Sequence, residues 1–187
     1  MRIVLTTMLA LAPLSAQVVR PVPATAQESG TSQMAAGRVT LVSLAAIARD
    51  CDRGFQTFAP TDPIDVLGRT RGIYLEGYGA VFTTELSPIL TPSLGPFRPS
   101  ISEPEKVQVR QRKLARLPAV ERLMNSMLQS AARELTTVPD DQQIVIAVKF
   151  LYLPYENTAG LPGQIVVKGT RRSILGGAQI VATVTNQ

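Results

Sequence analysis

The segment that most constrains the fold is "QQIVIAVKFLYLP" (142–154), which is apolar at nearly every position and rich in β-branched residues. Such a run is typical of a strand that is buried on both faces or nearly so, because a half-exposed strand would alternate apolar and polar side chains. A strand of this kind needs a neighbour on each edge. The sequence therefore predicts a sheet with this segment at its centre.

Two helical regions precede this strand. In the first, apolar side chains recur at steps of three and four along one face, with Thr40 as N-cap and Gly54 as the C-terminal stop. The second begins at Ser102, which has capping-box spacing to Glu105, and should end before Pro139. Pro118 removes a backbone donor there, so we expect either two helices or one kinked helix.

The stretch "RGIYLEGYGAVFTTELSP" (71–88) contains two glycines that could belong to a phosphate-binding loop or to a chain reversal. A dinucleotide-binding fingerprint needs a third glycine and a following helix, whereas here Gly79 leads into a strand sequence. We therefore expect a hairpin that reverses at Gly77 and Gly79. A continuous strand with a bulge at these glycines is the alternative.

For the hairpin, the sequence suggests which side chains face the core. The set expected inside is Ile73, Leu75, Val81 and Leu86. The set expected on an exposed or partner-covered face is Tyr74, Tyr78 and Phe82.

The order of elements predicts the fold class. Two further strands are expected at "QIVVKG" (164–169) and "AQIVATVT" (178–185), with one helical turn between them. Short connections between strands favour hairpins over crossovers. We therefore predict an α+β fold, in which helices pack on one face of a largely antiparallel sheet of four to five strands.

The N-terminus has the pattern of an export signal. Arg2 precedes a short apolar run broken by Pro13, and "ATA" at 24–26 fits signal peptidase. We expect a signal peptide over 1–26, a flexible leader over 27–37 and a single α+β domain over 38–187. No later segment is long and apolar enough to span a bilayer, so we expect a periplasmic or secreted protein without a transmembrane segment after cleavage.

Charge and cysteine content narrow the function classes further. Cleavage would lower the net charge from +5 to +3, because two arginines leave with the signal (17 basic minus 14 acidic residues remain). This is too small an excess to indicate nucleic-acid binding. The single cysteine, Cys51, lies on the apolar stripe of the first helix, where it fits a buried side chain.

The sequence contains no histidine, which removes Ser–His and Cys–His nucleophile pairs and histidine-based zinc sites. The acidic residues have neither calcium-loop spacing nor a spacing that brings two of them together. We therefore assign no catalytic residue, no metal ligand and no cofactor.

Two segments are candidates for binding. The basic run 106–116 includes Arg112 and Arg116, which lie one turn apart on a helix and could contact anionic lipid headgroups or an acidic partner. A solvated helix face is the alternative interpretation. The segment 152–164 offers Tyr152, Tyr155 and Asn157 as aromatic and hydrogen-bonding groups, although a plain connection between strands explains it equally well.

The segments "YLEGYGAVFTTEL" and "YENTAGLPGQIVV" resemble parts of uncharacterised exported bacterial proteins with a Tyr-x-x-Gly-Tyr-Gly-x-x-Phe pattern. The resemblance covers residues 38–176 and implies a location in the bacterial envelope. It implies no activity and no catalytic residue.

These observations favour a non-catalytic binding or interaction module of the bacterial envelope, whose partner is an envelope protein or an anionic envelope surface. One alternative is a histidine-free hydrolase that uses two carboxylates on cell-wall polymer or glycan. Another is a homo-oligomeric structural subunit that pairs exposed strand edges, such as that of 178–185.

Overall fold

The computed structural model describes residues 38–186, apart from 93, 98–99, 179 and 181. All of these belong to one compact unit, Met34–Gln187. The expected signal peptide and leader lie outside the described residues. Among the residues described, no helix is long and apolar enough to cross a membrane.

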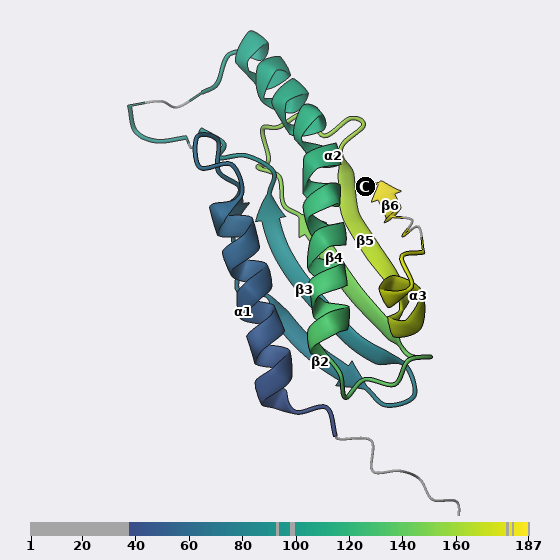
Figure 1. Ribbon diagram of the computed structural model, residues 1–187. Helices are drawn as coiled ribbons and strands as arrows, with labels where there is room; N and C mark the ends of the chain where they lie inside the picture. Colours follow the sequence, from purple (N-terminus) through teal and green to yellow (C-terminus); the bar gives the residue numbers. More distant parts are fainter. Residues whose placement is uncertain (1–37, 93, 98–99, 179, 181, 187) are drawn as a thin grey trace, which may run out of the picture. The chain divides into compact units, whose positions relative to one another are not determined.

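The described chain forms an α+β fold, as predicted (Figure 1). The elements are α1 (Leu41–Thr57), β1 (Asp65–Val66), β2 (Arg71–Leu75), β3 (Gly79–Ser87), α2 (Glu103–Glu134), β4 (Gln143–Phe150), β5 (Pro162–Thr170), α3 (Arg171–Leu175) and β6 (Ala182–Asn186). The strand order is β1-β3-β4-β5-β6, and β2 also pairs with β3. The two-residue strand β1 was not expected, because it is too short to leave a periodic signal.

The sheet is mostly antiparallel, with one parallel pairing between β3 and β4. A parallel pair needs a crossover connection, because the chain must return to the end from which it started. The 32-residue helix α2 is that connection. The expected antiparallel pairing therefore holds for the other pairs and fails at the centre of the sheet.

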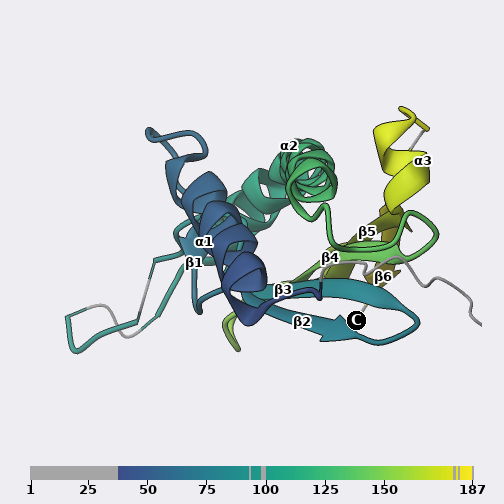
Figure 2. The same ribbon diagram turned by 60° about the horizontal axis from the view of Figure 1, so that its bottom comes forward.

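Helices α1 and α2 cover the same face of the sheet (Figure 2). We call this the inner face and the opposite one the outer face. Inner-face side chains of the strands pack with both helices in one core, which includes Phe55, Phe82, Met124, Leu128, Ala131, Ile144, Ile146, Val148 and Phe150. The largest of these side chains are fully buried, which fixes both helices on the sheet.

Strand β4 is the central strand, as its apolar sequence predicts. It pairs with β3 over Gln143–Phe150 and with β5 over Gln143–Lys149. On its outer side Val145 is buried and Ala147 is partly covered, whereas Lys149 is exposed. The nearly continuous apolar pattern therefore reflects full burial on one face and partial burial on the other.

Helix α1 begins as expected and ends later than expected. The Thr40 hydroxyl accepts a hydrogen bond from the Ser43 backbone N–H at 3.1 Å, which caps the first turn. Gly54 does not stop the helix, which continues to Thr57. Instead Gly54 lets α2 approach closely, because a Cβ there would lie 2.3 Å from the Met127 Cε.

Helix α2 continues through Pro118, and Figure 1 shows its axis changing direction near the middle. This selects the kinked helix over two separate helices. At its start, Ser102 occupies the N-cap position but makes no side-chain capping bond, so the expected capping box does not form. The helix ends at Glu134, before Pro139 as predicted.

The hairpin is confirmed, but the expected facing of its side chains holds only in part. Leu86 is fully buried and Tyr78 is exposed, as expected, whereas the other side chains face the opposite way. Gly77 and Gly79 have φ of 76° and 134°, and β2 pairs with β3 across them. Phe82 is fully buried on the inner face, while Ile73 and Leu75 are 52 % and 46 % exposed on the outer face. Apolar residues occupy both faces of this hairpin, so alternation alone cannot assign its register. Opposite Phe82, Gly72 leaves room for the ring, since a Cβ there would lie 2.7 Å from it.

The two turn glycines should differ in their tolerance of substitution. A Cβ at Gly79 would lie 1.9 Å from the Gln143 backbone carbonyl oxygen, whereas a Cβ at Gly77 meets nothing within 4 Å. We expect Gly79→Ala to lower the free energy of unfolding by about 3 kcal/mol, because strain and a backbone clash combine. Gly77→Ala should cost about 1 kcal/mol for its left-handed conformation alone. Urea unfolding measures both, and equal losses would contradict this account of the β3–β4 approach.

Candidate functional site

The two arginines predicted to bind a partner lie on α2 and contact Asp62. The Arg112 Nη2 donates to the Asp62 Oδ1 at 2.8 Å, and the Arg116 guanidinium donates to the Asp62 backbone carbonyl. The Arg116 guanidinium also lies 4.9 Å from the centre of the Phe58 ring. Both side chains therefore hold the turn after α1 against α2, and half of the Arg112 side chain stays exposed.

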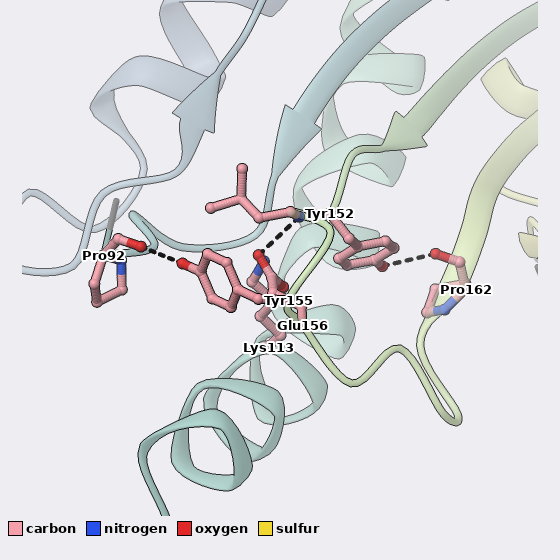
Figure 3. Close-up of polar contacts among 7 residues, drawn as sticks. Pro92, Lys113, Tyr152, Tyr155, Glu156 and Pro162 are labelled. Atoms are coloured by element: carbon pink, nitrogen blue, oxygen red, sulfur yellow. Dashed lines mark hydrogen bonds and ion pairs between the residues drawn. The ribbon is translucent and has the colours of Figure 1, made fainter. Parts of the chain in front are cut away.

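The segment 151–161 is also held by internal contacts, which Figure 3 shows. The Tyr152 hydroxyl donates to the Pro162 carbonyl oxygen at 2.7 Å, and the Tyr155 hydroxyl donates to the Pro92 carbonyl oxygen. The Asn157 Oδ1 accepts from the Ala159 backbone N–H at 3.0 Å. The aromatic and polar groups that suggested a recognition loop thus shape the loop itself, and a role for them in binding stays a prediction.

A buried ion pair joins this segment to α2 and was missed from the sequence. The Lys113 side chain is 0 % exposed and its Nζ lies 2.5 Å from the Oε2 of Glu156, whose side chain is 3 % exposed. The other Glu156 oxygen accepts from the Leu153 backbone N–H at 3.1 Å, and the Lys113 Nζ lies 5.0 Å from the Tyr152 ring centre. The spacing of Lys113, one helical turn after the buried Val109, places it on the buried side of α2. Lysines at such positions usually reach solvent, so the spacing alone does not predict a buried ion pair.

The surroundings of this pair shift the ionisation of its members. Burial lowers the pKa of Lys113, and the hydrogen bond and charge of Glu156 oppose that shift. Burial raises the pKa of Tyr152, and the Glu156 charge adds to the effect. Because Lys113 has no access to solvent, it can stabilise the loop but cannot reach a substrate.

A first hollow, of about 590 Å³, lies beside this loop at the ends of β4 and β5. Its described lining includes Lys149, Tyr152, Glu156, Gln164 and Thr185. The carboxylate among these residues, Glu156, is already engaged with Lys113. The hollow therefore offers mainly backbone, hydroxyl and amide groups to a ligand.

A second hollow, of about 440 Å³, is a groove between α1 and α2. Asp50 of α1 and Glu134 of α2 both line it, together with Cys51 and Met127. Asp50 also forms an exposed ion pair with Arg53 at 3.2 Å. This groove brings together two acidic residues that the sequence alone did not place near each other.

A third hollow, of about 340 Å³, lies on the outer face of the sheet. Arg69, Arg71 and Lys149 line it, with Glu85 as the acidic residue among its described lining. Lys149 pairs with Glu85 at 3.2 Å, whereas the side chains of the two arginines form no ion pair with any described residue. Sequence reasoning missed this cluster because its members come from three separate segments of the chain.

The strand register extends this cluster across the outer face. Thr83 lies opposite Arg71, Val81 opposite Ile73, and Lys168 of β5 opposite Val145 of β4. Lys168 is exposed and has no ion pair within the described chain. The outer face thus combines unpaired cations with the exposed side chains of Ile73 and Leu75.

Comparison with known proteins adds no information about the site. Comparisons with protein-family models, curated protein sequences and solved structures found no match. Within the described part of the chain, no group of three or more cysteine, aspartate or glutamate side chains could hold a metal ion.

Breaking the buried ion pair should destabilise the fold. Lys113→Met leaves the Glu156 carboxylate buried without a cation, so we expect a loss of about 3–5 kcal/mol in the free energy of unfolding. The matched control is Lys106→Met, since Lys106 pairs with the exposed Glu103 at 2.7 Å, and it should cost less than about 1 kcal/mol. Adding Glu156→Gln to Lys113→Met should restore part of the loss. Equal effects of Lys113→Met and Lys106→Met would contradict the importance of the pair.

Cys51 should resist alkylation in the native protein. It is 2 % exposed, and burial, followed by the charges of Asp52, Asp50 and Glu134, raises its pKa from 9.0 to about 12. Only the thiolate reacts readily, so iodoacetamide should label Cys51 quickly in urea and slowly without it. Between pH 9 and 12 the thiol ionises in the unfolded chain but stays protonated in the folded one. The contribution of Cys51 to the free energy of unfolding therefore falls as the pH rises. Cys51→Ala should remove this pH dependence. Rapid native labelling would overturn the core position.

Proposed function

We propose that the protein is an exported component of the bacterial envelope that acts as a non-catalytic binding module, and that its interaction surface is the outer face of the sheet. The observation that carries the proposal is the coverage of the sheet. Both long helices pack on the inner face, while the outer face exposes Ile73 and Leu75 beside unpaired cations. Exposed apolar side chains that lie next to polar ones mark interaction sites more often than isolated ones do.

The state of the other charged groups supports this choice of surface. Arg112 and Arg116 donate hydrogen bonds to Asp62, and Lys113 forms a buried ion pair with Glu156. The basic run on α2 therefore has fewer groups left for a partner than its sequence suggests. By contrast, Arg69 and Arg71 of the outer face form no ion pair with any residue that the structure describes.

Two other functions have some structural support. The groove that contains Asp50 and Glu134 is the feature that favours a hydrolase, because glycan cleavage needs two acidic residues across a cleft. Strand β6 is the feature that favours self-association, because it lies at the edge of the described sheet and has no charged residue. Neither the groove nor β6 combines unpaired charged side chains with exposed apolar side chains, as the outer face does.

The proposal can be tested by retention of the purified full-length protein on an isolated envelope fraction. The double variant Thr83→Gln/Thr183→Gln enlarges two exposed outer-face side chains without changing charge. It should weaken retention about fivefold, which corresponds to about 1 kcal/mol of binding free energy. The matched control, Thr57→Gln/Ser130→Gln, makes the same kind of change in the groove between α1 and α2 and should leave retention unchanged.

Loss of retention in the groove variant alone would overturn the choice of surface. Cleavage of cell-wall glycan by the wild-type protein, abolished by Glu134→Gln, would overturn the non-catalytic function. The same envelope fraction serves both measurements, so one protein preparation distinguishes the proposal from the hydrolase.

A further inference from the structure

We propose that the outer face docks on an anionic phospholipid bilayer, with Arg69, Arg71 and Lys168 against lipid phosphates and with Ile73 and Leu75 in the interfacial region. This inference rests on the proposed function and names the chemistry of its partner. Three observations carry it: the charge excess of the face, the position of its apolar side chains, and the lack of an ion-pair partner among the described residues for Arg69, Arg71 and Lys168.

The outer face has an excess of positive charge. On strands β2 to β5 and in the hollow beside them, Arg69, Arg71, Lys149 and Lys168 supply four cations and Glu85 supplies one anion, which leaves an excess of three. At the edge of the sheet, Asp65 of β1 lies opposite Ser87 and adds one anion. Glu85 is paired with Lys149, so it does not neutralise the remaining three side chains. This charge is complementary to a surface of phosphodiesters.

The cations of the hollow are grouped closely enough to act together. Arg69, Arg71 and Lys149 line one hollow of about 340 Å³, together with the hydroxyl of Thr83 and the amide of Gln164. Guanidinium groups bind phosphate through two parallel N–H donors, which suits a headgroup better than a diffuse charge would. The hydroxyl and the amide can donate further hydrogen bonds to the same group.

The apolar side chains lie beside these cations on the same face. Every second position of β2 faces outward, and these positions are Arg71, Ile73 and Leu75. Neighbouring members of this set are about 7 Å apart along the strand. The first is a cation, and the other two are half-exposed aliphatic side chains. Next to Ile73 lies Val81, which extends the apolar strip toward the centre of the sheet.

This pairing of charge with apolar surface favours a membrane over a soluble acidic polymer. A polyanion in water gains nothing from an adjacent aliphatic strip, whereas a bilayer takes up apolar side chains just below the phosphates that bind the cations. Tyr78, which follows in the turn after β2, is also exposed and has the amphipathic ring that membrane interfaces favour. The acidic Glu76 stands in the same turn and is exposed.

The test is flotation of the full-length protein with vesicles. One vesicle type is pure phosphatidylcholine and the other contains about one third phosphatidylglycerol, both at about 0.1 M salt. We expect binding to the anionic vesicles and at least tenfold weaker binding to the neutral ones. Insertion of the apolar N-terminal segment alone would give equal binding to both, which would contradict the inference.

The variants separate charge from apolar contact. Arg71→Gln/Lys168→Gln should weaken anionic-vesicle binding about 25-fold, at about fivefold for each cation lost near the membrane. The matched control is Arg122→Gln/Arg133→Gln, which removes the same charge from exposed positions of α2 and should change binding less than about threefold. Ile73→Thr/Leu75→Thr places β-branched residues, which favour strands, at both positions and should weaken binding at least fivefold, with the circular dichroism spectrum unchanged.

Two further arms identify the source of the anionic group. Inorganic phosphate at millimolar concentration should not release the protein from anionic vesicles, and polygalacturonate should bind it more weakly than the vesicles do. Release by phosphate, or tight binding to polygalacturonate without vesicle binding, would overturn the membrane inference. If envelope retention still depended on Thr83 and Thr183 in that case, the proposed function would stand while its lipid partner failed.

Discussion

The parallel pairing of β3 with β4 determines where the two long helices pack. It requires a crossover, and the crossover is α2, a helix long enough to span the sheet and to pack with α1 on one face. Because Gly79 has no Cβ, the Gln143 backbone carbonyl can approach it closely, which allows the two strands to pair at this position. Once both helices cover the inner face, the outer face is left to solvent or to a partner. The uncovered surface is thus a consequence of the topology.

The same crossover explains why the basic run on α2 has internal partners. Its first half extends toward the turn after α1 and toward the segment 151–161, so its cations meet Asp62 and Glu156. The buried pair of Lys113 and Glu156 carries a desolvation cost, which hydrogen bonding to Leu153 and contact with Tyr152 offset in part. Charge that the sequence places in one conspicuous cluster is therefore structural. The charge that stays available comes from Arg69, Arg71 and Lys168, which lie at scattered positions before and on β2 and on β5.

Much of the fold follows from local sequence, while the site does not. The central strand, the Thr40 cap, the reversal at Gly77 and Gly79 and the burial of Cys51 each depend on patterns within a few residues. The facing of Ile73 and Phe82 was predicted wrongly because both faces of that hairpin are apolar, and only the position of α1 over Gly72 decides between them. The outer-face cluster needed the strand register, which joins Arg71, Lys149 and Lys168 from distant parts of the chain. No local pattern contains that information.

The outer face, and not the helical face, should become buried when the protein binds its partner. A solvent-sensitive fluorophore on Thr83→Cys reports the outer face and one on Arg122→Cys reports α2, both in a Cys51→Ala background. On addition of the native envelope fraction, we expect a blue shift of the emission from position 83 and an unchanged emission from position 122. A shift at position 122 with none at position 83 would contradict it.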